Sequence, residues 1–187
     1  MFNLRTGFYA LLLTIVVLSG CNRKDPEPEN EKEEINRMEV VFTPVTGGNS
    51  VTFLFSDPDG EGGNPPTITA PPLRARTTYN VTITLSKDKD GKREDKTAEI
   101  RAEADEHQFF FIINPATLMT HRYDDVDKNN RPLGLRNIVE TQAAGSGTMR
   151  IVLRHDLNKA FPNLNNTNFQ QAGGETDIDV TFPVTVQ

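Results

Sequence analysis

The sequence predicts an all-β fold, an immunoglobulin-like antiparallel β-sandwich of about seven strands with one short surface helix. Apolar residues alternate with polar ones through most of the chain after residue 38. Clusters of Gly, Asn and Asp separate the alternating runs at short intervals. The 187 residues, 36% of them hydrophobic, suffice for one domain with a core, and a β-barrel is the alternative arrangement of the same strands.

The alternation also predicts the strands and their buried faces. We expect strands at 39–43, 50–56, 78–86, 108–113, 119–124, 148–155 and 177–186. A period of two with one polar face is typical of antiparallel strands over a single core. Their inward faces should carry Val51, Phe53, Phe55, Tyr79, Val81, Ile83, Leu85, Met149, Ile151, Leu153, Ile178, Val180, Phe182, Val184 and Val186. The last strand should turn Asp177, Asp179, Thr181 and Thr185 to solvent.

Local signals add loops, a helix and an edge strand to this pattern. Turn-forming residues predict loops at 46–49, 57–64, 144–147 and 172–174. The segment 94–107 is rich in helix-forming residues and lacks Gly and Pro, so it predicts a helix with a thin apolar stripe. Pro183 has no N–H to donate, and this places the last strand at a sheet edge or in a bulge.

The first 20 residues predict a lipoprotein signal peptide. Arg5 precedes an apolar run, FYALLLTIVVL from Phe8, which is shorter than the roughly 20 residues of a transmembrane helix. The sequence Leu18-Ser19-Gly20-Cys21 resembles the bacterial lipoprotein signal, in which the Cys thiol accepts a lipid. We therefore expect lipidation (palmitate labelling) of Cys21 after removal of residues 1–20. An ordinary secretory signal and a signal anchor are the alternatives.

The predicted organisation is residues 1–20 as signal peptide, 21–34 as lipidated Cys and acidic tether, and 35–187 as the β-sandwich domain. The tether cannot bury apolar surface, because residues 22–34 contain no aliphatic or aromatic side chain. We expect the protein in the bacterial cell envelope, at the outer membrane, in the periplasmic or the surface leaflet. The membrane is thus one expected partner, through the lipid.

Charge and cysteine content exclude several classes of protein. The net charge of −6 argues against nucleic acid as a partner, because no basic excess neutralises phosphates. A single Cys excludes an intramolecular disulfide and a zinc site built from several cysteines. The sequence predicts no cofactor.

Two acidic loops are candidate calcium sites. One carries Asp57, Asp59 and Glu61 among glycines, and the other carries Asp125, Asp127 and Asn129 at alternate positions. Calcium prefers several hard oxygen ligands from a flexible loop. Asp and Asn also favour turns for local reasons, so turn formation is the alternative and no metal ligand is assigned.

The three histidines, His107, His121 and His155, show no metal-binding spacing, because none has a partner His two or four residues away. We expect His107 at the C-terminal end of the helix, where it interacts with the helix dipole. If the last two strands pair, a cluster can form at one end of the sandwich, either as a site or as a salt-bridged surface network. Its expected members are Arg154, His155, Glu175 and Asp177.

The functional hypothesis is a lipid-anchored binding or structural module that is not an enzyme. The sequence contains no nucleophile elbow, P-loop or dinucleotide-binding motif. The expected ligand is a protein, a peptide or a glycan, and sandwich loops are the usual recognition sites. The alternatives are a carboxylate-dependent hydrolase of the envelope and a calcium-stabilised structural domain.

Several segments together resemble a family of small, uncharacterised Bacteroidota lipoproteins. They are EINR from Glu34, FSDPDGEGGN from Phe55, DEHQFFF from Asp105, LRHDLNK from Leu153 and GGETDI from Gly173. The resemblance spans nearly all of the chain after the tether and implies no activity, ligand or site residue. Some members are described as having a periplasmic-binding-type fold, which alternates helices with parallel strands and conflicts with the strand pattern of this chain.

Overall fold

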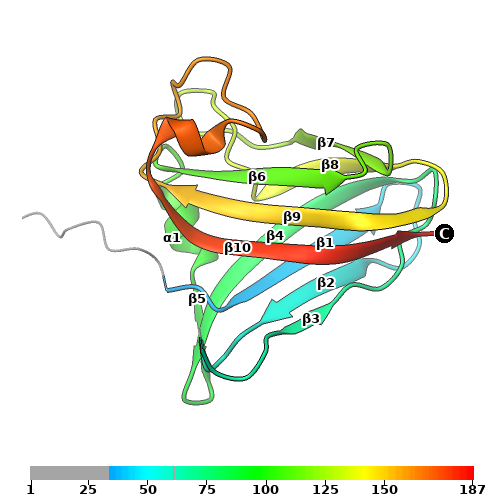
Figure 1. Ribbon diagram of the computed structural model, residues 1–187, viewed down its shortest axis with the longest axis horizontal. Coiled ribbons are helices and arrows are strands. Elements are labelled where there is room, and N and C mark those ends of the chain that lie inside the picture. The colour runs from blue at the N-terminus through cyan, green and yellow to red at the C-terminus, as the bar shows by residue number, and fades with distance from the viewer. Residues whose placement is uncertain (1–33, 61) are drawn as a thin grey trace, which may run out of the picture. The chain divides into compact units, whose positions relative to one another are not determined.

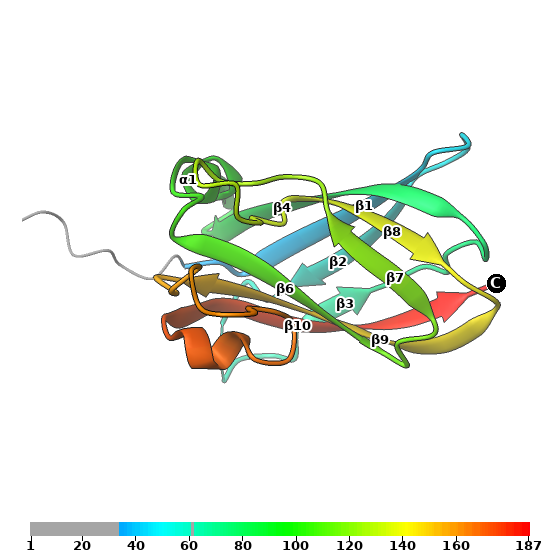
Figure 2. The ribbon, with the colours of Figure 1, turned by 90° about the horizontal axis from the view of Figure 1, so that it is seen from above.

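The computed structural model describes residues 34–60 and 62–187. Two antiparallel sheets pack face to face, as Figures 1 and 2 show. The larger sheet has the strand order β3-β2-β1-β4-β8-β7, with β5 paired to β4, and the smaller has the order β10-β9-β6. The predicted all-β sandwich is confirmed, and the sheets do not close into a barrel.

The described residues form ten strands rather than about seven. The larger sheet contains β1 (Arg37–Pro44), β2 (Val51–Ser56), β3 (Thr67–Thr69), β4 (Thr78–Lys89), β5 (Lys92–Asp95), β7 (Met119–Tyr123) and β8 (Arg136–Thr141). The smaller sheet contains β6 (His107–Asn114), β9 (Gly145–His155) and β10 (Glu175–Val186). All seven predicted strands are present, and β3, β5 and β8 are additional because they are short or largely exposed and carry little apolar alternation.

The core lies between the inner faces of the two sheets, on the side chains that the alternation predicts. Fully buried members include Phe42, Phe53 and Phe182, whose rings pack in sequence at centroid distances of 4.7 and 5.6 Å. The buried alternation in β4 and β10 runs through nearly the whole length of each strand. Because burial of apolar area drives this packing, the inner faces fix the register of both sheets.

The connection between β9 and β10, residues 156–174, covers the outer face of the smaller sheet and includes the short helix η1 (Phe169–Ala172). It builds a second, smaller apolar cluster with Phe110 of β6 and Val152 of β9, in which Phe110 stacks on Phe169 at 4.8 Å. Val152 is therefore buried although it lies on the face opposite the main core.

Backbone covers part of each edge of the smaller sheet. Leu73 donates its N–H to the carbonyl of Thr185 at 2.9 Å, along the free side of β10. Phe109 of β6 donates its N–H to the carbonyl of Leu133 at 2.7 Å. β10 is the edge strand of its sheet, as Pro183 predicts. Covered edges prevent pairing with other chains.

The predicted helix at 94–107 is wrong in its bounds, because α1 spans only Thr97–Ala102. Residues up to Asp95 instead form β5, which returns along β4 through a two-residue turn at Asp90 and Gly91, both with positive φ. The Asp95 carboxylate accepts the N–H of Thr97 at 2.8 Å where α1 begins. The apolar stripe is as thin as expected and centres on the buried Ile100.

The predicted loop at 144–147 is also wrong, because β9 already begins at Gly145. A Cβ on Gly147 would lie 2.2 Å from the carbonyl oxygen of Asn114, so this glycine permits close contact with the end of β6 rather than a turn.

Within the described residues, no helix has the length and apolar character to cross a membrane. The signal peptide, Cys21, nearly all of the tether and Glu61 lie outside the described residues.

Candidate functional site

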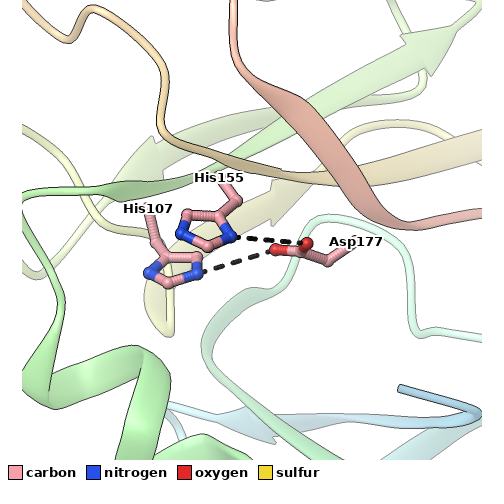
Figure 3. A group of neighbouring side chains, drawn as sticks. All are labelled: His107, His155 and Asp177. Carbon is pink, nitrogen blue, oxygen red and sulfur yellow. Dashed lines mark ion pairs between the residues drawn. The ribbon is translucent and has the colours of Figure 1, made fainter. Parts of the chain in front are cut away.

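Two histidines and an aspartate meet inside one end of the sandwich, and Figure 3 shows them. His107 begins β6, His155 ends β9, and Asp177 lies near the start of β10. The β6–β9 register places His107 directly opposite His155, and their rings stack at a centroid distance of 4.4 Å. We call these three residues the histidine–aspartate cluster.

Asp177 enters the cluster because β10 contains an irregularity at this residue. The pairing with β9 shifts register between Thr176 and Ile178, so Asp177 is an extra residue in the ladder. Strict alternation would turn Asp177 to solvent, as the sequence predicts, but its side chain has no exposed surface. A bulge re-aims a side chain in this way, and the prediction for Asp177 is wrong for that reason.

The carboxylate of Asp177 lies against one nitrogen of each ring. Its Oδ2 is 3.6 Å from His107 Nε2, and its Oδ1 is 3.8 Å from His155 Nδ1. One ligand-type atom from each of the three residues lies within 4.8 Å of the others. The side chains of His107 and His155 are 0% and 3% exposed, so the cluster is enclosed by the core.

The remaining nitrogens of both rings also face oxygen atoms. His107 Nδ1 lies 3.1 Å from the backbone carbonyl of Glu103, directly after α1. A carbonyl only accepts, so Nδ1 carries a proton in this contact, while Nε2 faces the Asp177 carboxylate. His107 thus contacts the residue that follows α1, but the prediction that it ends the helix is wrong, because α1 ends at Ala102 and His107 begins β6. His155 Nε2 lies 4.0 Å from the Glu106 carboxylate and 3.9 Å from that of Asp156.

A buried lysine joins the segment 156–174 to the strand that carries His107. Lys159 Nζ donates to the carbonyls of Ala104 and His107, at 2.7 and 2.8 Å, and pairs with Asp127 Oδ2 at 2.8 Å. Burial lowers the pKa of Lys159, against the opposing effect of Asp127. Burial would raise the pKa of Asp127, but hydrogen bonds, first that of Lys159, outweigh it and lower that pKa.

A cleft of about 370 Å³ lies between this segment and β7. Its walls combine rings, amides and the lysine: Gln108, His121, Tyr123, Pro132, Lys159, Phe161, Leu164, Asn165 and Asn166. Tyr123 donates its hydroxyl to the carbonyl of Phe109 at 2.7 Å, and burial raises its pKa to about 12. His121 stacks on Phe111 and bonds Asn137 at 2.9 Å, while burial lowers its pKa.

Asp59 of the first acidic loop and Asp125 and Asp127 of the second use their carboxylates for turn formation. Asp125 accepts the N–H groups of Gly134 and Arg136, at 2.7 and 2.9 Å. Asp127 Oδ1 accepts two further backbone N–H groups, while its Oδ2 faces the Lys159 ammonium. Asp59 Oδ2 accepts the backbone N–H of Asn64 at 2.8 Å and a side-chain amide N–H of the same residue at 2.7 Å. These contacts favour turn formation over calcium binding. In the second loop the ammonium group of Lys159 already pairs with Asp127.

The predicted cluster of Arg154, His155, Glu175 and Asp177 forms only in part. β9 and β10 pair as expected, and His155 and Asp177 meet. Arg154 lies on the opposite face, where it donates to the carbonyls of Gly173 and Gly174 and to Thr176 Oγ1. Glu175 is exposed. His107 is the third member of the cluster instead of Arg154 and Glu175. Only the pairing of the predicted strands 108–113 and 148–155 could have indicated this, and the sequence does not fix the register of that pairing.

Comparison of the chain with models of protein families, with curated proteins and with solved structures gives no match. The resemblance to Bacteroidota lipoproteins therefore stays a prediction, and the function is argued from the geometry.

Proposed function

We propose that this chain is a lipid-anchored module of the bacterial outer membrane that binds an envelope ligand and catalyses no reaction. The lipid on Cys21 and the acidic tether to residue 34 would hold the sandwich at the membrane. β1 begins at Arg37, directly after the tether, and the sandwich would carry the recognition surface.

The segment 156–174 carries the proposal. It joins two strands that are hydrogen-bonded neighbours in an antiparallel sheet. Two to five residues suffice for such a connection, and long connections in small domains usually serve a function. Here the chain instead crosses the outer face of the sheet, packs its own apolar cluster and forms one wall of the cleft with Phe161, Leu164 and Asn165.

The chemistry of the cleft suits a polar ligand. Sites for small ligands combine apolar or aromatic walls with a few fixed polar groups. Phe161 and Tyr123 supply rings, while Gln108 and Asn165 supply amides that both donate and accept hydrogen bonds. A sugar or a short peptide segment matches this combination. The ligand classes expected from the sequence, glycan, peptide or protein, remain the candidates.

The buried position of the histidine–aspartate cluster supports binding over the alternative of a hydrolase. A general acid or base must come within hydrogen-bond reach of the substrate. His107, His155 and Asp177 are enclosed by the core, at the opposite face of β6 from the cleft. The cleft therefore binds its ligand without these groups.

A binding screen tests the proposal. The full chain, purified in detergent, is applied to arrays of oligosaccharides, peptidoglycan fragments and peptides. We expect at least one class to bind, and Phe161→Ala to weaken that binding by about tenfold, equal to roughly 1.4 kcal/mol of contact. Val45→Ala is the control, because Val45 is exposed and lies outside the cleft. Equal binding by both variants would place the site elsewhere, and turnover of an arrayed compound would contradict a non-catalytic role.

A further inference from the structure

We propose that the histidine–aspartate cluster binds a divalent transition-metal ion of the Zn²⁺ type, through His107 Nε2, His155 Nδ1 and the carboxylate of Asp177. The ion would tie β6, β9 and β10 together at the root of the segment 156–174. This inference is independent of the ligand of the cleft.

The facing atoms are too far apart for direct hydrogen bonds between the rings and the carboxylate. Distances of 3.6 and 3.8 Å between imidazole nitrogen and carboxylate oxygen exceed the 2.7–3.2 Å of a hydrogen bond. Zinc binds imidazole nitrogen and carboxylate oxygen at about 2.0–2.2 Å, so tetrahedral ligands are separated by roughly 3.3–3.6 Å. Two of the observed separations are close to this range, and because the three ligand atoms lie within 4.8 Å of one another, the side chains would move together when an ion binds.

One nitrogen of each ring is directed at the carboxylate. Because His107 Nδ1 donates to the Glu103 carbonyl, Nε2 is the nitrogen with which the neutral ring would bind an ion, and it faces the Asp177 carboxylate. A cation between Nε2 and the carboxylate would be attracted by both groups. Figure 3 shows that both rings direct a nitrogen toward the carboxylate from the same side.

The second nitrogen of each ring faces an oxygen atom on the side away from Asp177. A metal-ligating histidine usually directs its other nitrogen at a carbonyl or a carboxylate, which orients the ring. His107 has the Glu103 carbonyl at 3.1 Å, and His155 has the Glu106 carboxylate at 4.0 Å. His107 thus has a hydrogen-bonded partner of the expected kind, and His155 faces a carboxylate at a longer distance, both from the turn between α1 and β6.

The donor set selects the class of ion. Two imidazole nitrogens with a carboxylate suit zinc and its neighbours among the transition metals, whereas calcium and magnesium prefer oxygen ligands. The second oxygen of Asp177 or a water molecule completes the coordination. Because the site is enclosed, the ion has a structural role.

The test uses the full chain in detergent, without a polyhistidine tag, stripped of metal with a chelator and then dialysed. Zn²⁺ is titrated in competition with a chromophoric chelator, and Ca²⁺ and Mg²⁺ serve as comparison ions. We expect one Zn²⁺ per chain and a rise in Tm of about 5 °C or more at saturation, with no rise for Ca²⁺ or Mg²⁺. Absence of stoichiometric Zn²⁺ binding would overturn the proposal.

Variants locate the ion. His155→Gln and Asp177→Asn should weaken Zn²⁺ binding by more than the 10–100-fold that is typical of losing an outer partner. His121→Gln is the matched control, since it removes a histidine that bonds Asn137 outside the cluster, and it should bind normally. Binding that survives in both cluster variants would overturn the assignment. If those variants do not fold, zinc-edge X-ray absorption of the native chain decides, because two imidazoles in the first shell support the site and fewer contradict it.

Discussion

Replacing Lys159 with Met should destabilise the domain by about 3–5 kcal/mol, the usual cost of removing one partner from a buried ion pair. The side chains of Lys159 and Asp127 are 1% and 0% exposed, so the substitution leaves the Asp127 carboxylate buried beside an apolar group. Two carbonyls, of Ala104 and His107, lose their donor as well. The loss is a large fraction of the 5–15 kcal/mol of total stability that is typical of a domain.

Urea unfolding at neutral pH measures this loss. Lys128→Met is the matched control, because Lys128 pairs with Asp105 at the surface and is 72% exposed, and it should leave the midpoint unchanged. Adding Asp127→Asn to Lys159→Met should recover part of the loss, since the stranded charge is removed. Equal midpoints for the two lysine variants, with unchanged m values, would refute the reasoning.

The same ion pair predicts the acid limit of stability. The pKa of Asp127 is lowered from 3.8 in the folded state, chiefly by Lys159 against the opposing effect of burial. Its contribution to folding is therefore complete above 3.8 and is lost as the pH falls through the lowered pKa. Lys159→Met should flatten this part of the acid-unfolding curve, and an unchanged acid limb would place the loss in other carboxylates.

Further predictions concern the core, the cleft and the second acidic loop. Phe182→Ala should lower the unfolding free energy by about 3–5 kcal/mol, because the ring is fully buried against Phe53, and an unchanged Tm would contradict the assignment of its face. Tyr123 has a pKa raised to about 12 by burial, so the unfolding free energy should fall by about 1.4 kcal/mol per pH unit between pH 10 and 12. In the Tyr123→Phe variant the unfolding free energy should not fall in this way between pH 10 and 12. If it still falls, another group causes the pH dependence. Millimolar calcium should leave the thermal unfolding curve unchanged, because Asp125 already accepts two backbone N–H groups, and a rise that Asp125→Ala removes would show a calcium site.

The sequence predicts the parts of the fold in which apolar alternation is long. β4 and β10 have buried positions at every second residue over most of their length, so their strands and faces follow directly. β3 and β5 are exposed along their whole length and form by pairing with a neighbour, which no periodicity within the strand reveals. The helix is overpredicted for the same reason, since 92–95 pairs with β4 despite its helix-forming composition.

The candidate site depends on two features that are not local. A register shift between Thr176 and Ile178 turns Asp177 inward, against the alternation of its own strand. The pairing of His107 with His155 joins residues far apart in the chain, and its register is set by packing of the whole sheet. Lys159 lies in a polar stretch without a pattern, and only the tertiary structure shows that it is buried.

Lipidation of Cys21 is the claim on which location and membrane partner both depend, and it lies outside the described residues. Growth with radioactive palmitate tests it directly, using the full chain and the variant Cys21→Ser. We expect label in the native chain at the size of the processed protein, and an unlabelled, unprocessed precursor for the variant. Equal labelling of the two, or a native chain without label, would contradict the account of a lipid-anchored module.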